Sequence, residues 1–151
     1  MIEYINGDIF DSECICLVNP VNCVGVMGSG LALQFRKRFP KNYYVYKIMC
    51  ENYSIGIGRP MFCKEGGKVI IDFPTKYHYR NKSKLEDIDK ALCAIPEILN
   101  KIFNGTIPIK NTIAVPAIGC GLGGLEWSQV KNLIENRLGN YPFTVKIYLN
   151  N

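Results

Sequence analysis

The sequence predicts a single α/β domain in which helices flank a central β-sheet. Strand-like apolar runs alternate with helical patterns along the whole chain, and no internal repeat, low-complexity stretch or linker interrupts them. This alternation is typical of layered α/β folds. The 151 residues, of which 48% are hydrophobic, suffice for one packed core. We therefore expect one domain over residues 1–151.

The first third of the chain predicts two strands followed by two helices. Residues 1–6 read as a strand, and residues 13–19 as a second strand that is apolar along most of its length, as a strand covered on both faces should be. A helix over 31–39 should end at Pro40. Proline suits the first turn of a helix, so a further helix is expected over 40–52.

The middle of the chain predicts a hairpin and a long helix. Short strands at 60–64 and 68–73 flank Gly66-Gly67, a pair suited to a tight turn. The segment Ser83-Lys-Leu-Glu86 has the spacing of a capping box, so a helix should begin there and run to about residue 103 despite an internal proline.

The last third predicts a strand, a helix and a closing strand. Asn104-Gly105 should stop the long helix. A short buried strand at 112–116 follows, then a helix over 128–138 ended by Gly139, and a strand over 143–149 with alternating apolar residues.

Charge and cysteine content limit the function classes. The 18 Lys and Arg outnumber the 13 Asp and Glu, and the formal charge of +5 favours an anionic ligand such as a nucleotide or nucleic acid. The seven cysteines form no CxxC pair and accompany a single histidine, so we expect reduced, mostly buried thiols and no metal. The chain start lacks a signal-peptide pattern and no apolar run is long enough to span a membrane, which predicts a cytosolic protein without a membrane partner.

Two glycine-rich loops, Gly25–Gly30 and Gly119–Gly124, each follow a predicted strand and precede a predicted helix. Glycine lets the main chain approach a ligand closely, so two such loops on one domain suggest backbone cradles for a diphosphate. Neither the dinucleotide GxGxxG order nor a P-loop lysine is present. A Rossmann dehydrogenase and a P-loop ATPase are therefore disfavoured.

Each polar residue at a predicted strand end has two interpretations, one as a ligand-binding or catalytic residue and one as a structural or surface residue. Asp8 follows the first strand, where its carboxylate would accept a hydrogen bond from an exocyclic amine or simply cap a turn. Asn22 would offer its amide to a ribose or serve its own turn. Lys76 lies in a loop with His78 and Arg80, and becomes a nucleophile only if its pKa falls; otherwise the loop is a solvated basic surface. A general-base role for His78 has little support, because no nucleophile motif accompanies it.

Four segments together resemble the macrodomain family: GDIF at 7–10, NPVNCVGVMGSGLALQFRKRFP at 19–40, FPTKYHYR at 73–80 and PAIGCGLGGLEW at 116–127. Within that family the chain looks most like the branch that contains the DarG antitoxin macrodomain and the terminal ADP-ribose protein glycohydrolase. The resemblance implies a three-layer fold with a mixed sheet of about six strands, and ADP-ribose bound across the carboxyl ends of the central strands. Cofactors other than this ligand are not implied.

The resemblance also implies a role for particular residues. Asp8 and the Ile9 backbone would bind adenine, and Asn22 the distal ribose. Lys76 would be the catalytic residue at the distal C1″ atom. The backbone of the two glycine loops would hold the diphosphate and distal ribose, through Gly28, Ser29, Gly30, Gly119, Cys120, Gly121, Leu122 and Gly123.

The implied function is an ADP-ribosyl glycohydrolase that acts on modified nucleic acid or protein. The protein glycohydrolase carries an aspartate in its phosphate loop where this chain has Gly123, which favours ADP-ribosylated single-stranded DNA as substrate. The alternatives are a module that only binds ADP-ribose and an ADP-ribose-1″-phosphate phosphatase. We also expect a monomer, with an ADP-ribosyltransferase toxin as a partner if the chain belongs to an antitoxin.

Overall fold

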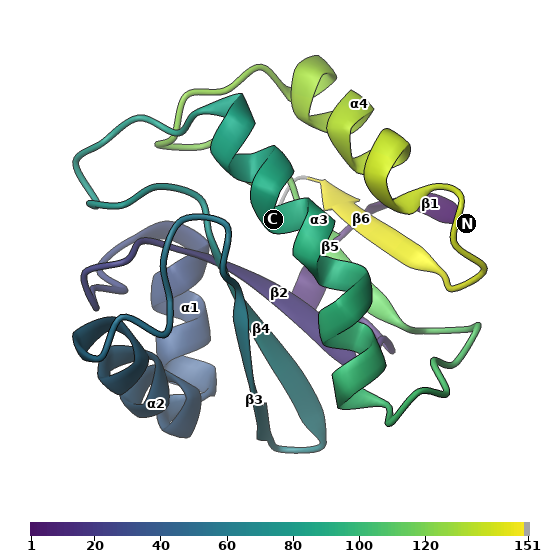
Figure 1. Ribbon diagram of the computed structural model, residues 1–151, viewed down its shortest axis with the longest axis horizontal. Coiled ribbons are helices and arrows are strands. Elements are labelled where there is room, and N and C mark those ends of the chain that lie inside the picture. The colour runs from purple at the N-terminus through teal and green to yellow at the C-terminus, as the bar shows by residue number, and fades with distance from the viewer. Residues whose placement is uncertain (150–151) are drawn as a thin grey trace.

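A six-stranded mixed sheet forms the centre of the molecule in the computed structural model, which describes residues 1–149 (Figure 1). The strands lie in the order β1-β6-β5-β2-β4-β3, and all neighbours are parallel except β3 and β4. Their bounds are β1 Ile2–Asn6, β2 Cys16–Val21, β3 Met61–Glu65, β4 Lys68–Pro74, β5 Ile113–Pro116 and β6 Val145–Leu149.

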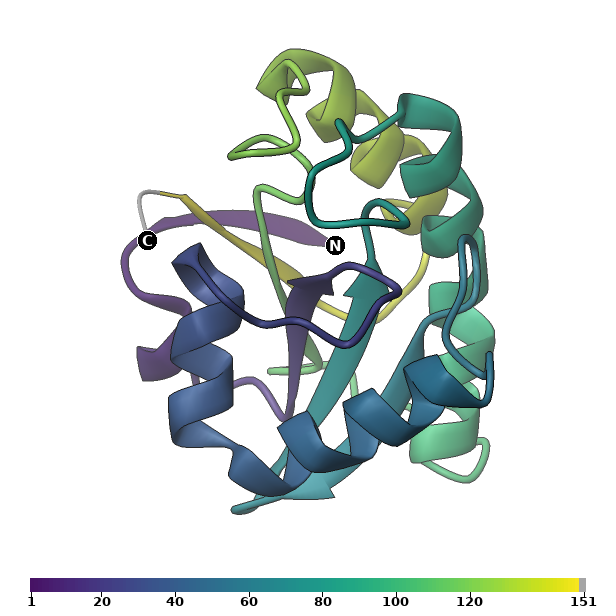
Figure 2. The same ribbon diagram turned by 90° about the vertical axis from the view of Figure 1, so that its left-hand side faces the viewer.

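Two pairs of helices enclose this sheet, so the fold has three layers (Figure 2). The helices are α1 Gly30–Arg38, α2 Pro40–Glu51, α3 Leu85–Ile102 and α4 Trp127–Leu138, with a short 3-10 turn, η1, at Ile9–Asp11. α1 and α2 cover one face, and α3 and α4 cover the other. Among the described residues, no helix combines the length and the apolarity needed to cross a bilayer.

Strand alternation divides the core between the two faces. Val18 and Ile71 pack with residues of α3 and α4, whereas their neighbours Leu17 and Ile70 pack with Phe35 of α1. Successive side chains of a strand point to opposite faces, so a central strand must be apolar on both sides. The predicted α/β class and six-stranded mixed sheet are therefore confirmed.

The second strand lies later in the chain than predicted. It covers residues 16–21 and not 13–19, because the Ser12 hydroxyl accepts a hydrogen bond from the Cys14 N–H and holds the preceding segment in a turn. At its other end Pro20 remains within the strand. β2 pairs with β5 only at Cys16 and Leu17, so the missing N–H of Pro20 breaks no ladder bond on that side.

The predicted capping box at the start of α3 does not form. The cap residue is Lys84, and the buried Ser83 hydroxyl has no hydrogen-bond partner within the described part of the chain. Ser83 instead donates its backbone N–H to the carbonyl of Gly123. The predicted end of this helix is confirmed, because Asn104 and Gly105 adopt left-handed conformations with φ of 50° and 88°.

Candidate functional site

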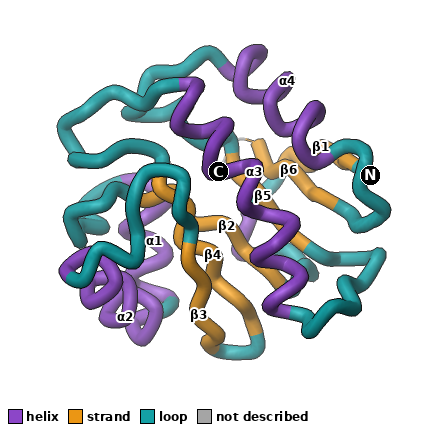
Figure 3. Tube along the Cα trace, viewed as in Figure 1, coloured by secondary structure: helices purple, strands orange, loops and turns teal. Residues whose placement is uncertain are grey.

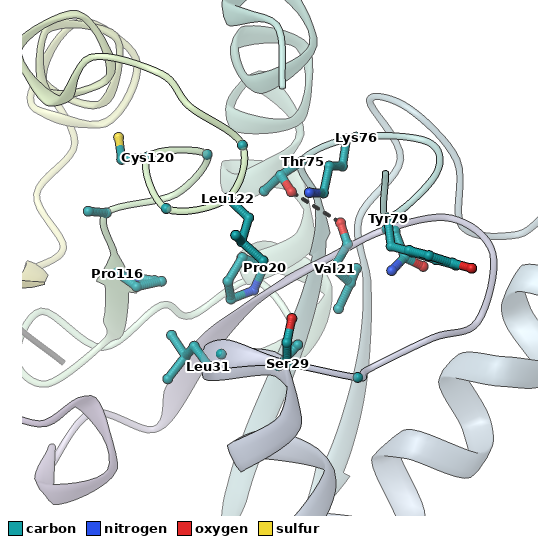
Figure 4. A pocket seen from close by; sticks show the side chains of 18 of the residues that line it. Pro20, Val21, Ser29, Leu31, Thr75, Lys76, Tyr79, Pro116, Cys120 and Leu122 are labelled. Carbon is teal, nitrogen blue, oxygen red and sulfur yellow. Dashed lines mark hydrogen bonds between the residues drawn. The ribbon is translucent and has the colours of Figure 1, made fainter. Parts of the chain in front are cut away.

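The loops that follow β2, β4 and β5 meet at one edge of the sheet (Figure 3). They surround a cavity of about 680 Å³. Carboxyl ends of parallel strands are where open α/β sheets bind ligands, so the cavity has the predicted location. Its lining comprises Pro20, Val21, Asn22, Val26, Gly28, Ser29, Gly30, Leu31, Ala32, Thr75, Lys76, Tyr79, Pro116, Ala117, Gly119, Cys120, Gly121, Leu122, Gly123 and Tyr148 (Figure 4).

The β2 loop, residues 22–29, is held together by the side chain of Asn22. Its Oδ1 atom accepts hydrogen bonds from the Tyr46 hydroxyl at 2.7 Å and the Val24 N–H at 3.1 Å, and its Nδ2 donates to the Val26 carbonyl at 2.7 Å. The side chain is only 7% exposed. Asn22 therefore shapes the loop beside the cavity, and a direct contact with a ribose remains a prediction.

The β2 loop leads directly into the first turn of α1, which also lines the cavity. Ser29 is the cap residue of this helix, and its side chain makes no capping hydrogen bond. The first N–H groups of a helix have no partner within the helix and carry a partial positive charge. Because Ser29, Gly30 and Leu31 line the cavity, this helix end faces the ligand space and suits an anion there.

The β5 loop, residues 117–126, is packed much more tightly. A Cβ atom at Gly119 would lie 2.9 Å from the Leu125 side chain. A Cβ atom at Gly123 would lie 2.4 Å from the Ser83 hydroxyl and 2.6 Å from the Gly119 carbonyl oxygen. Gly119 has a φ of 75°, a left-handed conformation that favours glycine, whereas Gly123 is constrained by the backbone oxygen beside it. The loop therefore offers backbone groups to the cavity.

Cys120 lies half-buried in the β5 loop, and its thiol contacts the Ile118 carbonyl at 3.5 Å. Burial raises the pKa of this thiol, which therefore stays protonated at neutral pH. This environment disfavours a nucleophilic role for Cys120 and agrees with a contribution from its backbone alone.

Lys76 follows β4 and lines the cavity between the β2 and β5 loops (Figure 4). The backbone before it is anchored at Thr75, whose N–H donates to the Val21 carbonyl at 2.9 Å. Burial lowers the pKa of the Lys76 ammonium, and the nearby Lys82 cation lowers it further. Both effects increase the fraction of neutral amine, which is the nucleophilic form.

Ten of the twelve predicted site residues line the cavity, and Asp8 and Ile9 do not. The Asp8 carboxylate accepts a hydrogen bond from the Phe10 N–H at 2.9 Å and caps η1, which is the turn role that the sequence left open. The Ile9 side chain is fully buried. Contact of these two residues with adenine remains a prediction.

Two aromatic lining residues were not predicted. Tyr148 lies near the end of β6, and its position at the carboxyl edge of the last strand was the available signal. Tyr79 belongs to a loop that the sequence singled out, but for Lys76 and not for the tyrosine. His78 is absent from the lining, and its Nδ1 accepts the Arg80 N–H at 3.1 Å.

No group of three or more His, Cys, Asp or Glu side chains within residues 1–149 is arranged to hold a metal ion. All seven cysteines are free thiols, and five of them are buried, as the sequence predicted. The lining of the cavity includes backbone groups of the glycine loops, the α1 N-terminus, the hydroxyl groups of serine, threonine and tyrosine side chains, and the amine of Lys76.

Comparison with known proteins assigns this architecture to a family. The Macro domain family matches residues 18–134. This chain belongs to the macrodomain family. The macrodomain of Mycobacterium tuberculosis DarG superposes with a TM-score of 0.91 at 36% identity, covering 100% of this chain and 99% of that one. Thermosipho africanus DarTG in complex with ADP-ribose gives a TM-score of 0.88 at 35% identity, over 99% of this chain and 41% of that one.

A curated relative of this macrodomain is the DNA ADP-ribosyl glycohydrolase of Mycobacterium tuberculosis. It is 37% identical over 147 residues, which cover 94% of this chain and 40% of that protein. The macrodomain thus spans about 40% of the length of this curated relative.

Proposed function

We propose that this macrodomain is an ADP-ribosyl glycohydrolase that removes ADP-ribose from DNA. The observation that carries the proposal is Lys76, a lysine of lowered pKa that lines the same cavity as two backbone cradles. The names of the DarG relatives and the ADP-ribose complex of the Thermosipho protein support the same ligand and reaction. A DNA-modifying ADP-ribosyltransferase must supply the substrate.

In this proposal the diphosphate lies between the first turn of α1 and the β5 loop. Backbone N–H groups and the positive helix end bind phosphate oxygens without a charged side chain. Gly119 and Gly123 let the loop approach closely, because the left-handed backbone at Gly119 and the short contact at Gly123 both disfavour a side chain. The distal ribose then reaches Lys76, on the opposite side of the cavity from Cys120 (Figure 4).

Lys76 acts on C1″ of that ribose in one of two ways. Its neutral amine attacks C1″ while the bond to the base breaks, or its ammonium stabilises the opening sugar. In both cases the oxygen of a water molecule ends on C1″ and the base leaves with a proton. The fixed backbone around Thr75 holds the lysine in reach of the carbon, which is how positioning contributes to rate.

Gly123 favours DNA over protein as the substrate. The protein glycohydrolase of this branch carries an aspartate at the matching position. Here even a Cβ atom would lie 2.6 Å from the Gly119 backbone oxygen, so the loop has no space for an aspartate side chain without moving its own backbone. This site therefore lacks the aspartate that a catalytic cycle with both a lysine and an aspartate would need.

The test is release of free ADP-ribose from ADP-ribosylated single-stranded DNA and from glutamate-ADP-ribosylated protein. We expect release from DNA, and a fall in kcat of about 100-fold or more for Lys76→Ala with ADP-ribose binding retained. Lys110→Ala, an exposed lysine outside the cavity, is the matched control and should behave as wild type.

Three outcomes contradict the proposal. Release from protein alone would assign the chain to the protein glycohydrolases. Phosphate release from ADP-ribose-1″-phosphate without activity on DNA would identify a phosphatase. Binding of ADP-ribose without any turnover would identify a module that only recognises the ligand.

A further inference from the structure

An exposed aromatic stack borders the cavity beside Lys76. Tyr79 lines the cavity and is 43% exposed. Its ring packs on that of His78, with centroids 4.1 Å apart and planes inclined by 33°. Figure 4 places Tyr79 at the edge of the site, on the same side as Lys76 and away from Cys120. One aromatic ring is thus supported from behind and accessible at the mouth of the cavity.

The segment that carries these rings is held in a fixed conformation. The His78 N–H donates to the Asn81 side chain at 3.0 Å, and the Asn81 N–H returns a bond to the His78 carbonyl at 2.9 Å. The Cys23 N–H donates to the Tyr77 carbonyl at 2.7 Å and joins the segment to the β2 loop. A ring that is already ordered loses little conformational entropy when a ligand stacks on it.

The charge around the stack suits a nucleic acid. Residues 76–84 include four cations and no acidic side chain. The Arg80 guanidinium carbon lies 5.7 Å from the centroid of the Tyr79 ring, and the Lys82 amine lies 3.4 Å from the Leu122 carbonyl across the mouth of the cavity. Aromatic faces interleaved with cations are the usual means of binding single-stranded nucleic acid.

An ordinary surface tyrosine does not share this environment. Tyr44 on α2 is 67% exposed and does not line the cavity. Exposed aromatic residues of this kind are common and need no functional explanation. Tyr79 differs because it borders the ligand space, has a ring behind it and lies three residues from the lysine that would act on the sugar.

We propose that the Tyr79 ring, backed by His78, is the surface on which the nucleobase that carries ADP-ribose stacks. This assignment rests on the proposed function, because it places the base on C1″ of the ribose beside Lys76. Stacking on a side chain requires that the base has left its own stack, so the site takes a base from a single strand. Tyr79 thereby gives the site a higher affinity for modified DNA than for free ADP-ribose, which has no base at C1″.

The experiment compares dissociation constants for three ligands: an ADP-ribosylated single-stranded oligonucleotide, an ADP-ribosylated mononucleotide and free ADP-ribose. Lys76→Ala serves as the parent protein, so the substrates survive the measurement. Adding Tyr79→Ala should weaken binding of both modified ligands by about tenfold and change the affinity for ADP-ribose by less than about twofold. Tyr79→Phe, which keeps the ring, and Tyr44→Ala should both match the parent.

Other results would overturn the assignment. If Tyr79→Ala left the affinity for the oligonucleotide unchanged, Tyr79 would not be the stacking surface. If it lowered the affinity for free ADP-ribose equally, Tyr79 would contact ADP-ribose itself. A loss for the oligonucleotide but not the mononucleotide would move the contact to a neighbouring base. These outcomes are separate from the proposed function, which fails if the wild type releases no ADP-ribose from DNA.

Discussion

The two loops that form the walls of the cavity are stabilised in opposite ways. In the β2 loop, one polar side chain, Asn22, makes four hydrogen bonds to backbone and hydroxyl groups, and these bonds stabilise the turn. In the β5 loop, the conformation depends instead on glycine, because Gly119 is left-handed and Gly123 lies close to the Gly119 carbonyl. Both loops line the cavity, but the conformation of one depends on hydrogen bonds and that of the other on the absence of side chains.

This difference predicts how each loop responds to change. A loop held by hydrogen bonds loses free energy in steps of about 1 kcal/mol as partners are removed. A close-packed loop fails when a single atom is added, because the backbone itself must move. The following substitutions test this contrast.

The largest effect is expected at Gly123. Its φ is not in the left-handed region, so Gly123→Ala tests space alone, and the new Cβ atom would meet the Gly119 carbonyl oxygen at 2.6 Å. We expect a loss of roughly 3 kcal/mol in the free energy of unfolding, measured by urea denaturation, and weaker ADP-ribose binding. Gly121→Ala is the control, since nothing lies within 4 Å of its Cβ position.

Equal stabilities for the two alanine variants would contradict the role of close packing in the β5 loop. If Gly121→Ala but not Gly123→Ala weakened ADP-ribose binding, contact with the phosphate and not close packing would explain why the β5 loop contains glycine.

A buried polar network lies beneath the β2 loop. Asp72 is fully buried, and its Oδ1 accepts hydrogen bonds from Asn19 at 3.1 Å and Asn42 at 3.0 Å. The amide of Asn19 also contacts the sulfur of Met27 in the loop at 3.7 Å. Burial raises the pKa of Asp72 to about 7. This carboxyl therefore titrates near neutral pH.

An intermediate effect is expected from this titration. Because the pKa of Asp72 is higher in the folded state than its ordinary value of 3.8, its contribution to stability is complete below about pH 4 and is lost as the pH rises through 7. Between pH 5 and pH 8 the wild type should lose about 2 kcal/mol that Asp72→Asn does not lose. Urea denaturation of both proteins at the two pH values measures this difference.

Asp11→Asn, which removes an exposed carboxyl, is the control for this comparison and should follow the wild type. Parallel pH dependences for the wild type and Asp72→Asn would show that the buried carboxyl does not titrate in this range.

The smallest effect is expected at Tyr46, which supports Asn22 from α2. Tyr46→Phe removes a hydroxyl that donates to Asn22 Oδ1 at 2.7 Å but leaves the Val24 N–H on the same oxygen. The expected loss is about 1 kcal/mol in the free energy of unfolding. Tyr44→Phe, on the exposed side of the same helix, should cost nothing measurable. A loss at Tyr46 as large as that at Gly123 would remove the distinction between the two loops.

Local sequence patterns predicted most helices and strands, because short-range backbone preferences set where these elements turn and end. The hairpin around Gly66-Gly67 and the helix stop at Asn104-Gly105 follow from backbone conformations that glycine and asparagine favour. The second strand was misplaced because of a local bond, from the Cys14 N–H to the Ser12 hydroxyl, but the capping box failed because of a distant residue. The backbone N–H of Ser83 donates to Gly123, forty positions later, so no local pattern reveals why the capping box fails.

The site was predictable to a different extent. Ten lining residues, including Lys76, came from motifs that the family resemblance placed in order. Two other features depend on contacts with α2, which only the three-dimensional structure reveals. These are the support of the β2 loop by Asn22 and the raised pKa of the buried Asp72. Tyr79 was missed as a lining residue, because a tyrosine in a basic loop has no motif of its own.

The contact between Ser83 and the β5 loop also constrains how this macrodomain could evolve a different mechanism. An aspartate at 123 would have to displace the Ser83 hydroxyl and also move the Gly119 carbonyl, two groups from separate segments of the chain. Accommodating an aspartate there therefore requires coupled changes in two segments that lie about forty residues apart in the sequence.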